Sequence, residues 1–240
     1  MSTASATRRA GLVKSSAAQL SDGFCLRIPP SAFTLDGFRA WLAADDFPEH
    51  VHVAFLNREV YVDMSKEELE YHAAVKAEIC RVLMNLIRVL MLGRFYLDGV
   101  LITNKQAGVA NKPDATFVSW ASLEKALVRL VPQTGRQGQY LEIEGTPDWV
   151  LEIVSDSSFV KDTQLLRTAY QRAGIPEYWL VDARGPEILF QILHWRKTGY
   201  VAVPRRGGWQ RSPVFGRHFR LVRKAARMGL WEYTLHMRPE

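Results

Sequence analysis

One short segment, 146–155 with the sequence TPDWVLEIVS, limits the possible folds more than any other part of the chain. Neighbouring residues of a β-strand point to opposite faces of a sheet. Since apolar residues occupy both alternating sets around Glu152, the pattern predicts a strand inside a sheet that is covered on both faces. A glutamate is rarely buried in such a strand unless a cation compensates its charge. The segment therefore predicts a layered fold and a cation beside Glu152, either an arginine such as Arg167 or a metal ion.

The rest of the sequence alternates between helical and strand-like segments. A capping box at Ser65 and Glu68 opens a helical periodicity over 66–92. Further helices are predicted over 31–48, 122–130 and 161–173. Strands are predicted over 51–56, 59–64, 95–103, 112–120, 146–155, 177–184 and 187–195, and short basic strands after residue 200. Loops are predicted over 104–111 and 130–139. The first two strands form a hairpin at Asn57 and Arg58. This order predicts the α/β (or α+β) class, with a mixed central sheet flanked by helices.

Length and composition fit a globular protein. The chain has 240 residues, of which 48% are hydrophobic, and this is enough for one sizeable core. We expect a single domain over 31–240 and a disordered leader over 1–30, which lacks the continuous apolar stretch of a secretory signal. The cysteines, Cys25 and Cys80, are too few for a disulfide framework or a cysteine-based zinc site and fit a cytoplasmic location. No apolar run reaches the roughly 20 residues that cross a bilayer, so no membrane partner is predicted.

Positive charge is concentrated at the C-terminal end. Residues 194–240 contain 11 lysines and arginines against Glu232 and Glu240, a surplus of 9, whereas residues 1–193 contain 20 basic and 23 acidic residues. A basic surface attracts phosphate backbones through counterion release. Arg205, Arg206 and Arg211 are therefore candidates for nucleic-acid binding, with DNA as the expected partner. A merely solvated surface is the alternative.

Asp114 adds a second carboxylate that is expected to meet Glu152. It follows Pro113 at the start of the strand 112–120 and shares a face with Thr116. Taken alone, an aspartate after a proline is a common turn residue at the start of a strand. If the two carboxylates converge from neighbouring strands, they repel each other unless a hard cation joins them. Mg²⁺ (or Mn²⁺) fits best, since it prefers oxygen ligands and retains positions for water and a phosphate oxygen.

Three stretches of the sequence together resemble one family. They are PDATFVSW (113–120), TPDWVLEIVSDSS (146–158) and KDTQLLRTAYQRAGIPEYWLVDARG (161–185). They are similar to the Uma-two family of bacterial proteins, which is grouped with the restriction endonucleases of the PD-(D/E)xK nuclease superfamily. The similarity extends over about 51–221. The resemblance implies a restriction-endonuclease-like core, a divalent metal held by Asp114 and Glu152, and a match between His72 and a histidine that family members carry near the start of the first helix.

Two positions depart from the family pattern. The superfamily lysine that comes two residues after the acidic residue is replaced by Val154, and the helix position where family members commonly have lysine holds Leu166. Lys161, at the turn between strand and helix, is the candidate substitute. Arg167 is the second candidate, although a guanidinium stabilises phosphate charge and does not act as a base at neutral pH.

Together with these residues, the resemblance implies a magnesium-dependent endonuclease that hydrolyses phosphodiester bonds in DNA. Its catalytic residues would be Asp114, Glu152 and Lys161, and Glu70 or Glu78 on the long helix could also reach the metal. Two alternatives remain open. One is a catalytically weak nucleic-acid-binding member of the same fold that has lost the lysine, and the other is a structural or interaction protein in which Glu152 is merely ion-paired. A homodimer, which could cut both strands, is a further option, although no interface motif supports it.

Overall fold

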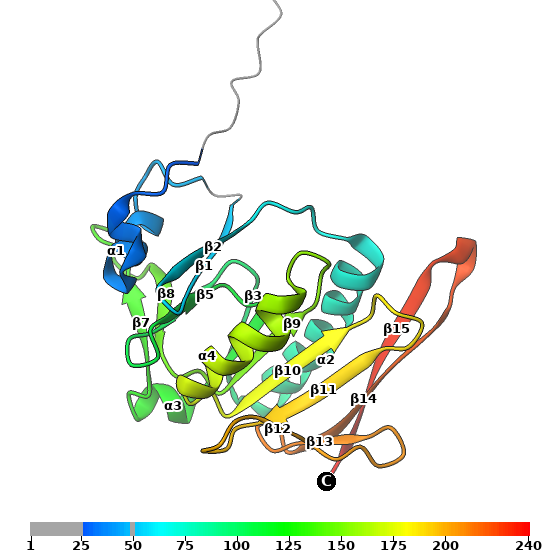
Figure 1. Cartoon of the computed structure of the whole chain (residues 1–240). Coiled ribbons are helices and arrows are strands. Elements are labelled where there is room, and N and C mark those ends of the chain that lie inside the picture. Colours follow the sequence, from blue (N-terminus) through cyan, green and yellow to red (C-terminus); the bar gives the residue numbers. More distant parts are fainter. Residues whose placement is uncertain (1–25, 49–50) are drawn as a thin grey trace, which may run out of the picture.

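The computed structural model describes residues 26–48 and 51–240, so most of the leader expected over 1–30 lies outside the described residues. The described residues form two six-stranded sheets and one three-stranded sheet (Figure 1). The strands are β1 His52–Leu56, β2 Glu59–Asp63, β3 Gly93–Leu97, β4 Leu101–Asn104, β5 Val109–Asn111, β6 Ala115–Ser119, β7 Val128–Pro132, β8 Tyr140–Gly145, β9 Trp149–Ile153, β10 Glu177–Asp182, β11 Leu189–His194, β12 Val201–Ala202, β13 Gln210–Ser212, β14 Arg217–Ala225 and β15 Trp231–Pro239. The helices are α1 Leu35–Leu42, α2 Ala74–Leu90, α3 Trp120–Glu124 and α4 Arg167–Arg172, with 3-10 turns over Pro30–Phe33 and Arg227–Gly229 and π-helical turns over Leu69–Ala73 and Lys161–Leu166.

The central sheet has the strand order β12-β11-β10-β9-β6-β3. It is mixed, because β9 and β10 are parallel while the other neighbours are antiparallel. Its strand β9 is the segment around Glu152, and it is buried along its whole length, as the apolar pattern predicts. Trp149 and Leu151 pack on the side of α2, whereas Val150 and Val154 pack on the side of α4. The two helices cover opposite faces (Figure 1), so the predicted mixed sheet flanked by helices is confirmed.

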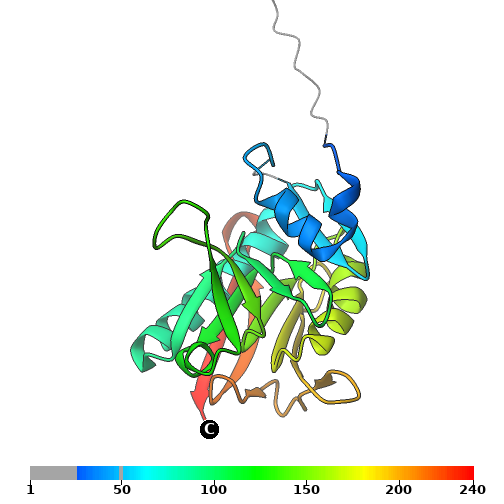
Figure 2. The same ribbon diagram turned by 90° about the vertical axis from the view of Figure 1, so that its left-hand side faces the viewer.

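The other six-stranded sheet has the order β2-β1-β5-β4-β8-β7 and lies on the α4 side of the central sheet. Ile102 and Ile143 of this sheet share one core with α4 and β9. Its outer face packs against α1 through Phe38, and Figure 2 shows α1 in blue over that face. The predicted hairpin is present, with Asn57 and Arg58 at positive φ angles of 54° and 67°.

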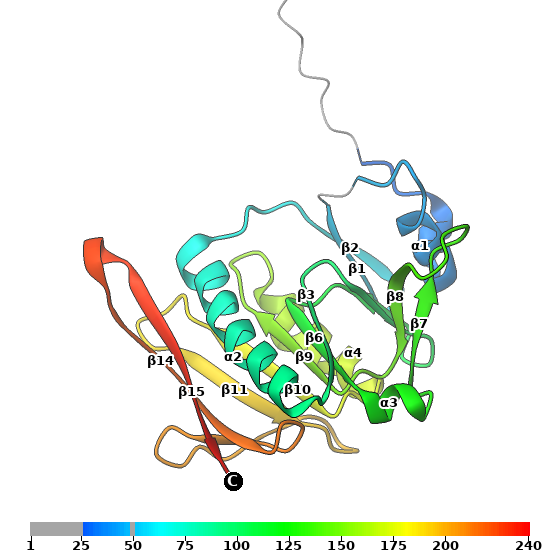
Figure 3. The ribbon, with the colours of Figure 1, turned by 180° about the vertical axis from the view of Figure 1, so that it is seen from behind.

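The three-stranded sheet β13-β14-β15 lies beside α2, on the face of the central sheet that is opposite α4 (Figure 3). Phe219 of β14 belongs to the same core as the apolar face of α2. The backbone N–H groups of Trp231 and Leu235, on the edge strand β15, donate to the carboxylates of Glu70 at 2.9 Å and Glu78 at 3.0 Å. These two carboxylates, expected to reach the metal, instead cover part of an otherwise open sheet edge.

The long helix begins later than predicted. Ser65 does not cap it, because its hydroxyl lies 2.9 Å from Ser157 Oγ and residues 64–68 form no helix. The side chain of Glu68 accepts from the first backbone N–H groups instead, and the π-helical turn and α2 follow. Met91 ends the helix with a φ of 49°, so Gly93 already belongs to β3. The periodicity identifies the buried face of the helix, but not which of two nearby acceptors closes its first turn.

Three predicted segments are wrong in type or extent. The strand expected over 95–103 is divided into β3 and β4 of different sheets, and Gly99, with a φ of 85°, lies in the turn between them. The helix expected over 122–130 is α3 followed by β7, and Ala126, the middle one of the three residues between them, has a φ of 53°. The loop expected over 104–111 contains β5, and β8 was not predicted. Short strands of this kind depend on partners from distant parts of the chain, which a local pattern does not reveal.

The predictions after residue 160 hold better. The helix expected over 161–173 is present as the π-helical turn and α4, and Gly174 ends it with a φ of 74°. Strands β10 and β11 pair along their full length as an antiparallel ladder. Among the helices of the described part, none has the length and apolar character needed to span a bilayer.

Candidate active site

The chain passes from one six-stranded sheet to the other between β5 and β6, and this crossing builds the site. Asn111 ends β5, and Asp114 stands immediately before β6. In the antiparallel pairing of β6 with β9, the first residue of β6, Ala115, lies opposite Leu151, the neighbour of Glu152. The backbone N–H of Asp114 donates to the Leu151 carbonyl at 3.1 Å, which is one residue out of the register of that ladder. Asp114 and Glu152 line the same cleft, and the charge of Asp114 raises the pKa of Glu152, so the two predicted carboxylates come together here.

Glu152 is buried, with 3% of the residue exposed. Its Oε1 accepts hydrogen bonds from Asn111 Nδ2 at 2.9 Å and from the Tyr170 hydroxyl at 2.5 Å. Burial raises the pKa of Glu152 well above its usual range. The charge of Lys161 opposes this rise, and the negative charges of Asp162 and Asp114 add to it. The ionised form of Glu152 is therefore disfavoured until a further cation comes near.

Asp114 has the opposite tendency. Its Oδ1 lies 3.4 Å from His72 Nε2 and 3.3 Å from Lys76 Nζ, and its Oδ2 accepts the backbone N–H of Ile153 at 2.7 Å. Burial alone would raise the pKa of Asp114, but the hydrogen bond and charge of His72, the charge of Lys76 and the Ile153 N–H together lower it below its usual range. Two carboxyl groups in one cleft thus have pKa values shifted in opposite directions.

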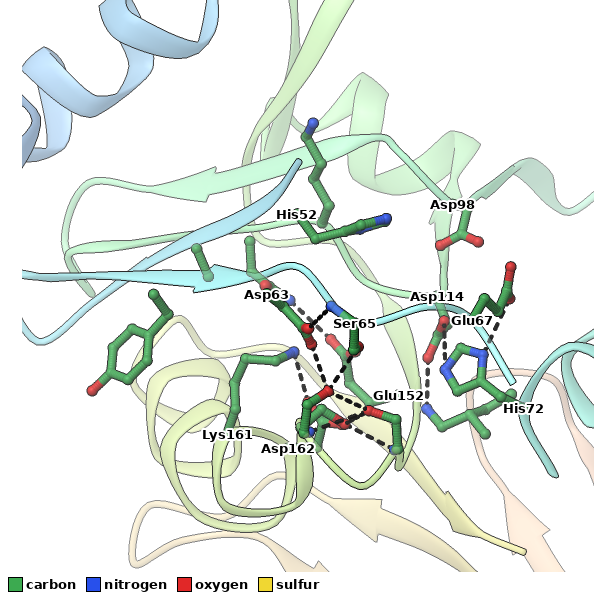
Figure 4. Close-up of a pocket in the computed structure, with 18 of the residues that line it drawn as sticks. His52, Asp63, Ser65, Glu67, His72, Asp98, Asp114, Glu152, Lys161 and Asp162 are labelled. Atoms are coloured by element: carbon green, nitrogen blue, oxygen red, sulfur yellow. Dashed lines mark hydrogen bonds and ion pairs between the residues drawn. The ribbon is translucent and has the colours of Figure 1, made fainter. Parts of the chain in front are cut away.

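Lys161 begins the π-helical turn that leads into α4. Its ammonium group forms an ion pair with Asp162 Oδ1 at 2.7 Å, and Ser158 Oγ donates to the other oxygen of Asp162 at 2.5 Å. Burial would lower the pKa of Lys161, but the charges of Glu152 and Asp162 raise it above its usual range. The ammonium group therefore stays charged in the same cleft as Glu152 (Figure 4).

Lys76 is a cation of the site that the sequence analysis missed. Its Nζ lies 2.5 Å from Glu67 Oε1 and 2.5 Å from Asp98 Oδ2, in addition to its contact with Asp114. His72 Nδ1 lies 3.2 Å from the same oxygen of Glu67. One signal could have found Lys76, because residues four apart share a helix face and His72 was already a candidate. Asp98 has no local signal, since it comes from the turn between strands of different sheets.

These side chains line one polar cleft with a volume of about 380 Å³ (Figure 4). Hydroxyl groups link β2 to the loop after β9, because Ser157 Oγ donates to Asp63 Oδ2 at 2.9 Å and lies 2.9 Å from Ser65 Oγ. The charged and polar residues that line the cleft are His52, Asp63, Ser65, Lys66, Glu67, Glu68, His72, Lys76, Asp98, Asn111, Lys112, Asp114, Glu152, Ser155, Ser157, Ser158, Lys161 and Asp162.

The four predicted arginines do not line this cleft. Arg167 Nη2 donates to the backbone carbonyl of Tyr200 at 3.0 Å. Arg205 likewise binds a backbone carbonyl, at 2.8 Å, and Arg211 forms an ion pair at 2.9 Å with the glutamate at the C-terminus. Arg206 is exposed. Of the two candidates for the missing lysine, Lys161 is therefore the one that lies with the carboxylates.

The donor atoms fit a hydrated hard cation better than one enclosed by protein ligands. Within residues 26–48 and 51–240, no group of three or more His, Cys, Asp or Glu side chains is arranged to hold a metal ion. Asp114 and Glu152 offer two carboxylates, and the described residues donate hydrogen bonds to only one oxygen of Glu152. Mg²⁺ usually retains several waters and binds through one or two carboxylates. The residues present fit Mg²⁺ or Mn²⁺ in this mode.

Comparisons with known proteins agree with the motifs. The model of the Uma2 family, described as "Putative restriction endonuclease", matches residues 35–232. The fold is similar to a crystal structure described as "a putative nuclease belonging to DUF820 from Anabaena variabilis ATCC 29413", with a TM-score of 0.51 and 16% identity over 76% of this chain and 90% of that chain. A search of curated proteins gave no match. Because the family model covers well over half of the sequence, the resemblance in the motifs is confirmed and the chain belongs to the Uma2 family.

Proposed function

We propose that this member of the Uma2 family is a divalent-metal-dependent endonuclease that hydrolyses phosphodiester bonds in DNA. The observation that carries the proposal is the pair Asp114 and Glu152, which come together where β6 begins beside β9, with Lys161 in the same cleft. Two carboxylates alone would repel a phosphate, whereas a hard cation held between them would attract it. The family description supports a nucleic acid as substrate.

The side chains around the pair would fix the two metal ligands. Asn111 and Tyr170 hold one oxygen of Glu152 and leave the other available, while His72 and Lys76 hold Asp114. When bound, Mg²⁺ or Mn²⁺ would lower the pKa of a coordinated water and neutralise charge on the phosphate.

Lys161 would act on the substrate rather than on the metal. Its ammonium group, held by Asp162, would orient the attacking water or stabilise the charge that develops on the phosphate in the transition state. A lysine at the start of a helix would thereby replace the lysine whose usual place on the strand holds Val154.

Cleavage assays test this function. The native protein is expected to nick or cut DNA only with Mg²⁺ or Mn²⁺ present, and Glu152→Gln should abolish cleavage while the protein stays folded. Lys161→Ala should slow turnover by roughly 100-fold with little change in DNA affinity, since its contribution belongs to the transition state. The matched control Glu124→Gln changes an exposed carboxylate on α3 and should cut like the native protein. Full activity of Glu152→Gln, or of the native protein in chelator, would refute the metal mechanism.

A nucleic-acid-binding protein with little catalytic activity is the second candidate, and Val154 in the place of the superfamily lysine favours it. Metal-dependent cleavage separates the two. In either case we propose that Arg205, Arg206 and Arg211 contact DNA phosphates outside the cleft, and that the protein acts in the cytoplasm, where cysteines such as the buried Cys80 remain reduced. For the endonuclease, we propose that a pair of copies would be needed to cut both strands at once.

A further inference from the structure

The cleft holds a lysine that takes part in none of the contacts described above. Lys76 and Lys161 also line the cleft with largely buried side chains, and each contacts at least one carboxylate. Lys112 also lines the cleft and is half-buried. Among residues 26–48 and 51–240, no carboxylate lies within the 4.0 Å of an ion pair from Lys112.

The backbone determines where Lys112 stands. It lies in the crossing between the two large sheets, directly after Asn111, which binds Glu152, and two residues before Asp114. A residue that precedes proline is restricted to extended conformations, and Pro113 has a fixed φ, so this crossing is stiff. In this short segment Asn111 therefore binds Glu152, Lys112 lines the cleft, and Asp114 contacts strand β9.

Packing against neighbouring side chains does not by itself explain why the ammonium group of Lys112 is half-buried. The ammonium nitrogen of Lys112 lies 5.9 Å from the centroid of the Phe47 ring, which is near the outer limit of a cation–π contact. A half-buried ammonium group that has lost part of its hydration is stabilised by an anion. Since no carboxylate of the described residues lies within ion-pair distance of Lys112, an anionic ligand that enters the cleft would supply a partner for this charge.

We propose that Lys112 binds a phosphate oxygen of the nucleic acid and thereby positions the strand that enters the cleft. The inference rests on the proposed function, because it takes DNA as the substrate. The ionised oxygens of a phosphodiester are the acceptors that an ammonium group prefers, and contacts of this kind fix the register of a bound strand without reading its sequence.

DNA binding without metal tests this assignment. In the Glu152→Gln background, which cannot cut, the affinity for a short fluorescent duplex is measured by anisotropy over a range of salt concentrations. Lys112→Met keeps the apolar stem beside Phe47 and removes the charge, so affinity should fall roughly tenfold and the slope of log affinity against log salt should decrease by about 1. Lys112→Arg keeps the charge and should retain the slope. The exposed Lys125, outside the cleft, provides the matched control Lys125→Met.

The outcomes separate this inference from the proposed function. An unchanged slope in Lys112→Met, a slope lost equally in Lys112→Arg, or no DNA binding at all would overturn the role of Lys112. The native protein is assayed separately for cleavage of the same duplex with Mn²⁺. If DNA binding depends on Lys112 but no cleavage occurs, the endonuclease is refuted and the phosphate-binding role of Lys112 is supported. If cleavage depends on metal but DNA binding does not depend on Lys112, the endonuclease is supported and the role of Lys112 is refuted.

Discussion

Two carboxyl groups in one cleft should respond in opposite ways when their charge is removed. Burial disfavours the ionised form of Glu152, so Glu152→Gln should leave the metal-free protein as stable as the native protein or more so. Asp114 is favoured in its ionised form by His72 and Lys76, so Asp114→Asn should lower the free energy of unfolding by about 3 kcal/mol. Denaturant titrations in chelator measure both. An equally large loss in both variants would mean that Glu152 is a structural ion-pair partner.

A second buried glutamate, far from the cleft, predicts a pH effect on stability. Glu177 accepts hydrogen bonds from Trp179 Nε1 at 2.6 Å and from Ser212 Oγ at 2.6 Å, yet burial raises its pKa to about 7. In the unfolded chain the same group titrates near 4.5. Between these values the folded state holds a proton that the unfolded state has lost, so stability should fall as pH rises through this window.

The variant Glu177→Gln isolates this effect. It keeps an acceptor for Trp179 and Ser212 but does not titrate, so it should lose a pH-dependent difference on the order of 3 kcal/mol. Denaturant titrations of both proteins at about pH 5 and about pH 8, near the low end of this window and above its high end, measure this difference. If the two proteins lose the same stability over this range, Glu177 is not the group responsible.

At the level of elements, the junction between α2 and the edge strand β15 yields a prediction. A double variant, Glu70→Ala and Glu78→Ala, removes the acceptors of the Trp231 and Leu235 N–H groups on this edge. The free energy of unfolding should fall by about 1 kcal/mol per lost hydrogen bond. The opened edge should also promote association of copies. Glutamine at both positions keeps an acceptor and serves as the control. Denaturant titration and sedimentation over a concentration range measure the two effects, and an alanine variant that is as stable as the glutamine variant and associates no more strongly would contradict them.

The elements that could be predicted from sequence are those with a complete local signal. The β1–β2 hairpin is specified by two short strand-like runs and a two-residue turn, and the end of α4 is specified by Gly174. The strands β3 and β4 lacked such a signal, because one apolar run covers both and the turn at Gly99 sends them to different sheets. The first turn of α2 was also misplaced, since Ser65 satisfies the sequence rule for a cap while Glu68 makes the contact.

For the whole molecule, the carboxylate pair could be predicted and its surroundings could not. Asp114 stands directly before a strand with a clear pattern and Glu152 stands within one, so bringing the two together required only that these strands be neighbours. Asp98 and Lys112 come from the turn and the crossing that connect the two large sheets, and their position depends on the sheet order. Sequence separation hides such contacts, because no local periodicity relates residues in different sheets.

The basic C-terminal segment shows why net charge is a weak guide to a binding surface. Arg223 donates to three backbone carbonyls of the loop after β10 and lies 4.4 Å from the Trp231 ring. Arg220 and Arg238 lie 5.1 Å and 4.5 Å from the ring of Trp209. Several guanidinium groups therefore hold the C-terminal sheet together, and the formal surplus of charge overstates what is available to DNA.

Binding of a divalent cation to the carboxylate pair can be measured directly by calorimetric titration of Mn²⁺ into the metal-free protein. The native protein and the control Glu124→Gln are predicted to show the same saturable binding. Asp114→Asn and Glu152→Gln, each of which removes one of the two charges that attract the ion, should each lose it. Equal binding by all four proteins, or no binding by the native protein, would contradict a metal site between Asp114 and Glu152.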